Sequence, residues 1–171
     1  AELVKNIASA STEQSSNTQQ ISRAIEQLAK VTQQNSAASE ERKQTKTLLA
    51  ADFSKSKDHE LGELLKNADM RVRMKAQFEL AKRGANGHTV FQKLVGQRDN
   101  QLARVNAIWG ISQLARQDNN YAKSLLPLLQ DNDPEIRAQA AKWLGDIRYK
   151  EAGDKLIPVL KDEFSRARFF A

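Results

Sequence analysis

The stretch that decides the fold is Asp133-Pro134-Glu135-Ile136-Arg137, followed by Ala140 and Leu144. The same frame occurs twice before it, at Val72-Arg73 with Ala76 and Leu80 and at Ala103-Arg104 with Ala107 and Ile111. A fourth, shortened copy begins at Ala167-Arg168. The arginines at 73, 104, 137 and 168 therefore recur every 31 to 33 residues. A repeat of that length is typical of helical solenoids.

Each repeat arginine is predicted to lie in the second helix of a helical pair. The residue four places before it can cap that helix, because a short polar side chain there accepts hydrogen bonds from the free N–H groups of the first turn. These cap residues are Asp69, Asn100 and Asp133. We expect the caps and the arginines (Arg73, Arg104, Arg137 and Arg168) to form a structural ladder rather than a ligand clamp.

Residues 58–171 are therefore predicted to be all-α, a right-handed α-solenoid of about three and a half helical pairs. The first helices of the four pairs are expected around 60–65, 90–95, 125–129 and 155–160, and Gly84 is expected to end the first pair. The apolar positions of the second helices recur at helical spacing and are expected to be buried. They are Val72, Ala76, Leu80, Ala107, Ile111, Ile136, Ala140 and Leu144.

The first 50 residues contain no glycine or proline, which favours one long helix. We expect this helix over residues 1–41 and a linker or continuation over 42–57. An apolar seam includes Val4, Ile7, Ile21, Ile25 and Leu28, but Ser, Thr, Gln and Asn occupy the positions between them. Such a seam suits self-association in a loosely packed bundle rather than a tight two-stranded coiled coil. The alternative is a frayed polar tail.

Residues 3–41 also resemble one family. The segments 7–15, 21–25 and 31–35, with Glu40-Glu41, are similar to the C-terminal methylation helix of methyl-accepting chemotaxis receptors. The resemblance implies that Glu41, and more weakly Glu13, are methylated, and it implies a cytoplasmic signalling module. The pattern departs at Arg42-Lys43-Gln44, and the signalling tip of the family is not included.

The repeats resemble a second family over residues 58–171. The segments 69–80, 107–110 and 136–142 are similar to HEAT repeats, both those of phycobilin-lyase-like proteins and those of planctomycete-type proteins that join a dehydrogenase-like domain to a haem-binding domain. The resemblance to the planctomycete-type proteins implies an exported or periplasmic protein. Neither the catalytic propeller nor the haem motif falls in this segment. Because the two resemblances differ, we expect the chain to be a fragment or fusion of a larger protein.

Composition argues against several kinds of function. The chain has no cysteine, and its two histidines, His59 and His88, are far apart in sequence, so no metal or cofactor is expected. No catalytic constellation is present, and we expect no enzymatic activity. No apolar run approaches the roughly 20 residues of a membrane span. The net charge is +6, but the basic residues alternate with acids, so nucleic-acid binding is only a remote alternative.

The function that remains is a non-catalytic scaffold that binds a protein partner through the concave face of the solenoid, with the signalling module as the alternative. Counting two, five and nine residues from each arginine gives one helical face. Its residues are Lys75, Phe78, Lys82, Asn106, Trp109, Gln113, Gln139, Lys142 and Asp146. Phe78 and Trp109 occupy equivalent places, and two interpretations are open: both pack between helices, or both anchor the partner.

Overall fold

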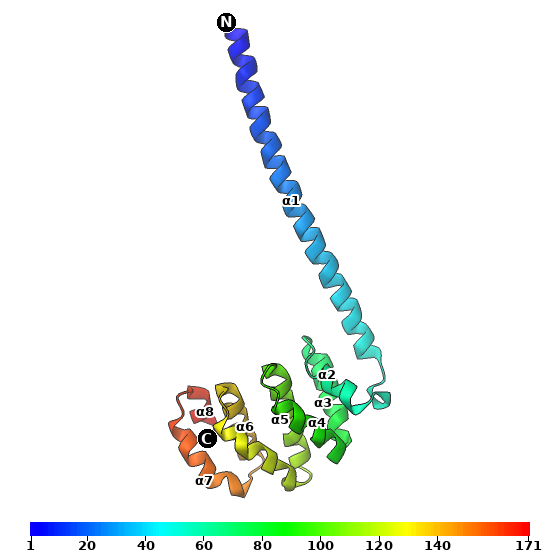
Figure 1. Cartoon of the computed structure of the whole chain (residues 1–171), viewed down its shortest axis with the longest axis vertical. Coiled ribbons are helices and arrows are strands. Elements are labelled where there is room, and N and C mark those ends of the chain that lie inside the picture. The colour runs from blue at the N-terminus through cyan, green and yellow to red at the C-terminus, as the bar shows by residue number, and fades with distance from the viewer. The chain divides into compact units, whose positions relative to one another are not determined.

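The structure, a computed structural model, describes residues 1–171, and every regular element in it is helical (Figure 1). The chain divides into two compact units, Ala1–Thr47 and Leu48–Ala171. The prediction of an all-α solenoid is confirmed by the packing of the second unit described below.

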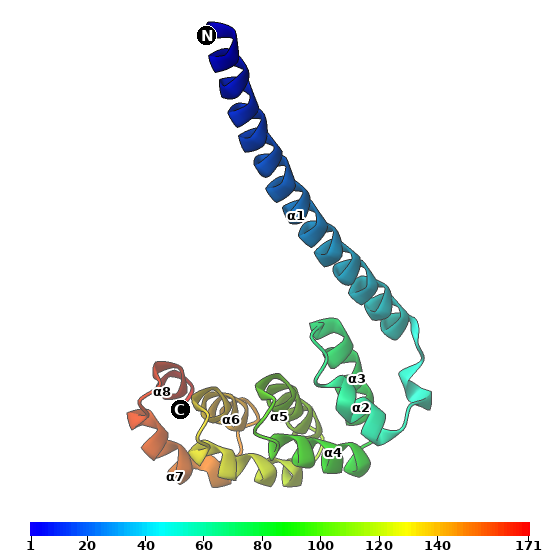
Figure 2. The ribbon, with the colours of Figure 1, turned by 45° about the horizontal axis from the view of Figure 1, so that its top comes forward.

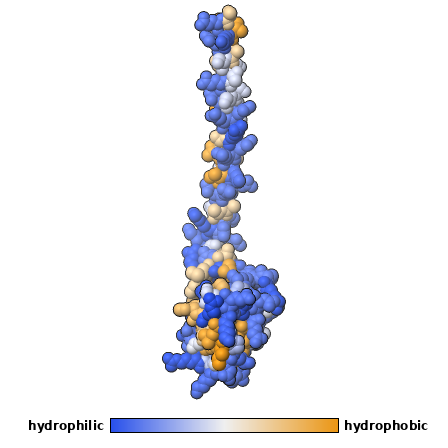
Figure 3. Space-filling view, turned by 90° about the vertical axis from the view of Figure 1, so that its left-hand side faces the viewer, coloured by the Kyte–Doolittle hydropathy of each residue, from blue (hydrophilic) through white to orange (hydrophobic).

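The first unit is most of one helix, α1, which runs from Glu2 to Ala50. None of its side chains is buried. The apolar residues of the predicted seam are therefore in solvent, where Val4 is 71% exposed and Leu28 is 65% exposed. Figure 3 shows small apolar groups separated by polar surface along this helix. The Ser and Thr hydroxyls at 12, 18, 22 and 47 donate to carbonyls one turn earlier rather than to any neighbour.

The second unit consists of four pairs, each with a first element (A) and a second helix (B). The A elements are α2 (Asp58–Leu64), α4 (Ala85–Val95), η2 (Asn119–Gln130) and the succession η3 (Lys150–Ala152), α7 (Gly153–Leu156) and η4 (Ile157–Lys161). The B helices are α3 (Met70–Lys82), α5 (Gln101–Ala115), α6 (Pro134–Asp146) and α8 (Ser165–Phe170). Successive B helices pack side by side, α3 on α5, α5 on α6 and α6 on α8. Figure 2 shows the A elements from α4 onward in one layer and the B helices in the other.

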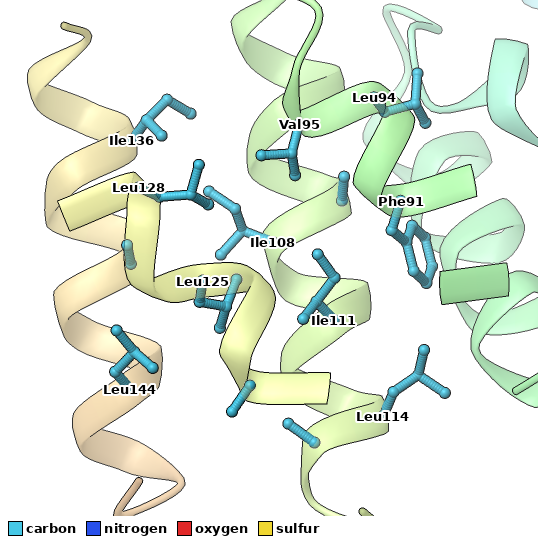
Figure 4. Packing of buried hydrophobic residues seen from close by; sticks show 14 of the residues in the cluster. Phe91, Leu94, Val95, Ile108, Ile111, Leu114, Leu125, Leu128, Ile136 and Leu144 are labelled. Atoms are coloured by element: carbon cyan, nitrogen blue, oxygen red, sulfur yellow. The ribbon is translucent and has the colours of Figure 1, made fainter. Parts of the chain in front are cut away.

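The core lies between the two layers. All eight predicted core residues are at most 1% exposed, which confirms the helical register drawn from the repeat arginines. Figure 4 shows Ile108 of α5 beside Leu125 and Leu128 of η2, with Ile136 and Leu144 on α6. Apolar side chains from each pair thus meet those of the next, and one continuous core cluster spans the unit.

Two of the predicted first helices are not regular α-helices. The segment around Leu125 belongs to the 3₁₀ element η2, which contains Pro127, and the segment around Leu160 belongs to the 3₁₀ element η4, which has Pro158 near its start. Proline has no N–H to donate and crowds the preceding turn, so it disfavours a continuous α-helical hydrogen-bond ladder. The tighter 3₁₀ turn keeps Leu125 and Leu128 facing the core.

The geometry requires glycine at several positions, among them Gly84 and Gly110. Gly84 joins the first pair to the second. Its φ is +57°, a backbone conformation that residues with a side chain disfavour. Gly110 lies on α5 where the ring of Phe91 from α4 rests, and an added Cβ would overlap the atoms of that ring. The absence of a side chain at Gly110 lets α4 and α5 approach closely.

The segment between α1 and α2 covers the first end of the solenoid. It contains η1 (Phe53–Lys55), whose Phe53 is buried in the core cluster. Lys75 of α3 donates to the carbonyls of Leu49 at 2.7 Å and Ala51 at 2.6 Å, and its ammonium lies 4.6 Å from the Phe53 ring centroid. Arg83 donates to the Phe53 carbonyl and forms an ion pair with Asp58. These contacts take the place of a preceding repeat for α3.

Candidate functional site

A groove of about 850 Å³ lies across the B helices α3, α5 and α6. Eleven residues line it, most of them with long polar or aromatic side chains. They are Met74, Gln77, Phe78, Ala81, Lys82, Trp109, Ser112, Gln113, Arg116, Gln117 and Trp143. The volume lies within the range of roughly 300–1,000 Å³ that is typical of ligand sites.

Three aromatic rings line the groove, one each from α3, α5 and α6. Phe78 of α3 is 42% exposed, whereas Trp109 of α5 and Trp143 of α6 are half-buried and pack against the core cluster. Trp109 Nε1 donates to Gln139 Oε1 at 2.8 Å. Gln139 in turn donates to Glu135 one turn earlier on α6, at 2.8 Å. Trp109 is therefore held in one orientation, and Phe78 is the ring with the most accessible surface.

Cations surround the third ring. The ammonium of Lys142 lies 3.8 Å from the Trp143 ring centroid, and the guanidinium of Arg116 lies 5.7 Å from it. Both distances are within the range of cation–π attraction. Lys142 also forms an ion pair with Asp146 at 2.6 Å. Arg116, at the C-cap of α5, is exposed and makes no salt bridge.

The floor of the groove is polar between α3 and α5. Gln77 Nε2 donates to Gln113 Oε1 at 3.1 Å. Gln77 is only 4% exposed, and its own Oε1 atom is buried without a hydrogen-bond donor. Ser112 is also buried, and its hydroxyl donates to the Trp109 carbonyl at 2.8 Å. One buried acceptor on this floor is therefore unsatisfied, at a cost in free energy.

The charges on the lining are all positive. Lys82 and Arg116 are its two charged residues, and no Asp or Glu is among them. Lys82 has a carboxylate neighbour in Glu79, but the two charged atoms are 3.5 Å apart and the Lys82 side chain is 75% exposed. Glu79 is also shared with Arg83 at 3.6 Å. The groove thus combines an apolar, aromatic surface with a lining whose only charged side chains are positive.

The structure divides the predicted binding face into three sets. Phe78, Lys82, Trp109 and Gln113, at positions five and nine after Arg73 and Arg104, line the groove. The residues at position two do not line it: Lys75 binds the end of α1, while Asn106 and Gln139 are buried. Gln139 reaches Trp109 on the preceding B helix, α5, and Asn106 donates to the Leu102 carbonyl within its own helix. Lys142 and Asp146 pair with each other beside the groove.

Sequence reasoning missed part of the lining. The residues that it did not include are Met74, Gln77, Ala81, Ser112, Arg116, Gln117 and Trp143. Most of them lie four, eight or twelve residues after an arginine, so the centre of the groove face is rotated slightly from the predicted one. Trp143, at position six, carried the only available signal, since it is an aromatic residue next to the predicted Lys142.

The repeat arginines bind their own loops. Nη1 of Arg73 donates to the carbonyls of Asn67 and Ala68, both at 2.7 Å. Arg137 and Arg168 bind the carbonyls six and five residues before them in the same way. Arg104 differs, because its Nε donates to the Val95 carbonyl at 2.7 Å. In each repeat the guanidinium holds carbonyls that precede the B helix.

Two arginines also bind the following repeat. Arg104 makes two hydrogen bonds to Asp131, at 3.1 and 2.5 Å, and Arg137 makes two to Asp162, at 2.6 and 2.8 Å. The Asp131 carboxylate also accepts the Asp133 N–H, and the Asp162 carboxylate accepts the Phe164 N–H in the same way. Each aspartate therefore shapes its own loop and joins it to the preceding B helix.

The arginine–aspartate pair that joins a B helix to the following repeat forms one rung of the ladder. No such rung is present between the first and second repeats. The residue that corresponds to Asp131 and Asp162 is Arg98, six places before Arg104. Arg73 is only 7% exposed, and its Nε is buried without an acceptor.

Hydrogen bonding lowers the pKa of three carboxyls that precede the B helices, those of Asp69, Asp131 and Asp162. The side-chain hydrogen bond from Arg71, opposed by burial, lowers the pKa of the cap Asp69 to about 2. The hydrogen bond from Arg137 lowers the pKa of Asp162, and the same bond raises the pKa of Arg137. Burial raises the pKa of Asp131, but its hydrogen bonds from Arg104 and the Asp133 N–H outweigh burial and lower it overall. The cap Asn100 accepts from the Ala103 N–H, and the cap Asp133 accepts from the Glu135 N–H.

The other residues that the sequence analysis considered for methylation or metal binding do not form a cluster. Glu13 and Glu41 are exposed on α1. His88 Nε2 lies 2.7 Å from Ser124 Oγ and its ring lies against Tyr121, while His59 is exposed on α2. Burial lowers the pKa of His88. No group of three or more His, Cys, Asp or Glu side chains is arranged to hold a metal ion. None of the helices has a stretch that is both long and apolar enough to cross a membrane.

Comparison with known proteins gives one family. Residues 89–171, from α4 to the end of α8, match the family model described as HEAT repeats. The curated proteins contain no match to this chain. The match covers the second to fourth pairs, and the first pair continues the same packing through α3 and α5. The family and the structure agree on a HEAT-type helical solenoid, a fold that commonly serves as a protein-binding scaffold.

Proposed function

We propose that this HEAT-like solenoid is a non-catalytic scaffold that holds a segment of a protein partner in the groove of α3, α5 and α6. The observation that carries the proposal is the row of aromatic rings along that groove, of which Phe78 is 42% exposed. Aromatic side chains, together with arginine, contribute most of the energy at many protein interfaces. An exposed phenylalanine beside a half-buried tryptophan has no role in the solenoid core.

The geometry of the lining supports a preformed site. Trp109 is held by Gln139, and Gln77 by Gln113, so these side chains already have fixed orientations before a partner arrives. A fixed surface reduces the entropy that a partner must lose on binding. The rest of the solenoid acts as a rigid support, because the B helices pack directly on one another.

The test is selection from a random peptide library displayed on phage, with the whole chain as the target. We expect enriched peptides to bind with micromolar dissociation constants and to bind Phe78→Ser at least ~10-fold more weakly, the usual effect of losing a hot-spot side chain. The matched control is Leu160→Ser, which replaces an apolar residue that is 53% exposed and lies outside the groove. A selection that yields no binder, or binders indifferent to Phe78→Ser, would contradict the proposal.

A second function is favoured by α1. Leu3, Val4, Ile7, Ile21, Ile25, Leu28 and Val31 are all at least 50% exposed on this helix. We propose that α1 self-associates and buries this stripe in a bundle, as the alternative of a signalling module related to chemotaxis receptors requires. An isolated helix gains little from propensity alone, so packing of an apolar face is what stabilises most helices.

Sedimentation of the whole chain tests the self-association. We expect a concentration-dependent assembly that is lost in the Ile21→Ser, Ile25→Ser and Leu28→Ser triple variant, with the solenoid still folded. The matched control replaces three residues off the seam, Gln19, Glu26 and Gln33, with Ser. A chain that stays monomeric at high micromolar concentration would show that α1 does not act in this way, and the groove proposal would be unaffected.

A further inference from the structure

We infer that the groove selects an acidic segment of its protein partner, with an aromatic or aliphatic side chain as the anchor. This inference rests on the proposed function, because it names the chemistry of the occupant of the same groove.

Charge on the lining favours carboxylates. Its two charged residues, Lys82 and Arg116, lie on different helices, and no acidic side chain lines the groove with them. Arg116 makes no salt bridge, whereas Lys82 Nζ lies 3.5 Å from Glu79 Oε2, with the Lys82 side chain 75% exposed and the Glu79 side chain 14% exposed. Glu79 does not line the groove, so the lining itself carries only positive charge. Lys142 adds a third positive charge against the Trp143 ring beside the groove, but Asp146 compensates it. Complementary charge of this kind mainly decides which partner is accepted and how fast it associates.

Apolar surface between these charges favours an anchor. Phe78 and Met74 are large, exposed or half-exposed side chains on α3, and Trp109 faces the same groove from α5. A purely acidic chain would leave this surface in water. An aromatic or aliphatic side chain flanked by carboxylates covers the rings and places negative charge near Lys82 and Arg116 at once.

The floor of the groove offers amide groups to a peptide main chain. Gln113 and Gln117 both line the groove. Their side-chain amides can donate and accept hydrogen bonds, as the N–H and C=O groups of a main chain do. The groove also has only two cations, whereas nucleic-acid backbones are usually followed by a longer row.

The experiment uses three phage libraries of equal length that share a central Trp, Phe or Leu. The flanking positions are randomised from Asp, Glu, Ser and Gly in the first library, from Asn, Gln, Ser and Gly in the second, and from Lys, Arg, Ser and Gly in the third. The target is the whole chain, in its natural form and as the double variant Lys82→Glu with Arg116→Glu. Labelled oligothymidylate, measured by fluorescence anisotropy, is a fourth probe.

We expect the natural chain to enrich the acidic library and the double variant to enrich the basic one. A selected acidic peptide should bind the double variant at least ~10-fold more weakly, since two favourable charge contacts become repulsive. The matched control is Lys93→Glu with Lys123→Glu, which makes the same change in net charge with exposed residues outside the groove. This control should bind the acidic peptide as the natural chain does.

Each of the other possible results leads to a different conclusion. Enrichment of neutral or basic peptides that depends on Phe78 overturns this inference and leaves the scaffold function standing. No enrichment from any library overturns both. Acidic peptides that bind equally to the Lys82 and Arg116 double variant overturn the inference, because their site lies elsewhere. Oligothymidylate binding that the double variant abolishes, without peptide binding, overturns it in favour of nucleic acid.

Discussion

The indole of Trp109 and the amide of Gln139 are joined by a hydrogen bond of 2.8 Å between Nε1 and Oε1. The bond links α5 to α6, and the same indole lines the groove. Trp109 thus both packs between helices and faces the groove. The two interpretations of Trp109 that the sequence left open are not exclusive for this residue. Phe78 differs, because it is exposed and makes no such bond.

Trp109 should contribute to stability in two separable parts. Trp109→Phe keeps an aromatic ring but leaves Gln139 Oε1 without a donor, so we expect the free energy of unfolding to fall by about 1–2 kcal/mol. Trp109→Ala also removes the packed ring and should cost about 3–5 kcal/mol. Urea unfolding followed by circular dichroism measures both. A cost below about 0.5 kcal/mol for Trp109→Ala, the size of a surface change, would show that the ring does not pack.

Replacing Leu144 should destabilise the chain as strongly as the loss of a core side chain does. It is 1% exposed in the cluster that joins η2 and α6. We expect Leu144→Ala to lower the free energy of unfolding by about 2–5 kcal/mol, because the substitution leaves a cavity. Leu160→Ala is the control, at 53% exposure, and should stay within about 0.5 kcal/mol. Equal effects of the two variants in chemical unfolding would contradict the structure.

The Arg137–Asp162 rung should make stability depend on pH. The hydrogen bond from Arg137 lowers the pKa of Asp162 in the folded chain, so its contribution is complete above the unfolded pKa, about 3.9. The contribution is lost as pH falls through the lower folded pKa. We expect Asp162→Asn to cost about 2–4 kcal/mol at pH 7 and the difference from the natural chain to shrink as the pH falls below about 4. Urea unfolding at several pH values measures it, and a difference that stays constant through this range would refute the link.

Arg98→Asp should supply the missing rung of the ladder. Arg73 has a buried Nε without an acceptor, and Arg98 occupies the position that is aspartate in the next two repeats. We expect the substitution to raise the free energy of unfolding by about 1 kcal/mol, the value of one added hydrogen bond. Urea unfolding measures the gain, and Arg98→Ala separates removal of the arginine from gain of the carboxylate. In an Arg73→Met background the gain should disappear, and a gain that persists there would mean that the introduced carboxylate acts through another residue.

The sequence by itself determined the helical repeats, their register and their caps. These features depend on contacts within one or two turns: the 3.6-residue period selects the buried face, and Asp69, Asn100 and Asp133 bond to N–H groups two or three residues ahead. All eight predicted core residues are buried for that reason.

Tertiary structure alone decided which polar side chains stay exposed and which are buried or hydrogen-bonded to a distant part of the chain. Gln139 is buried because Trp109, 30 residues earlier, reaches it, and Lys75 is occupied by carbonyls more than 20 residues away. The Arg104–Asp131 bond likewise joins residues 27 apart. Trp143 enters the groove only through the packing of α6 on α5. Helical periodicity shows which side of a helix is polar, but a neighbouring helix covers part of that side, and its position depends on the packing of whole repeats.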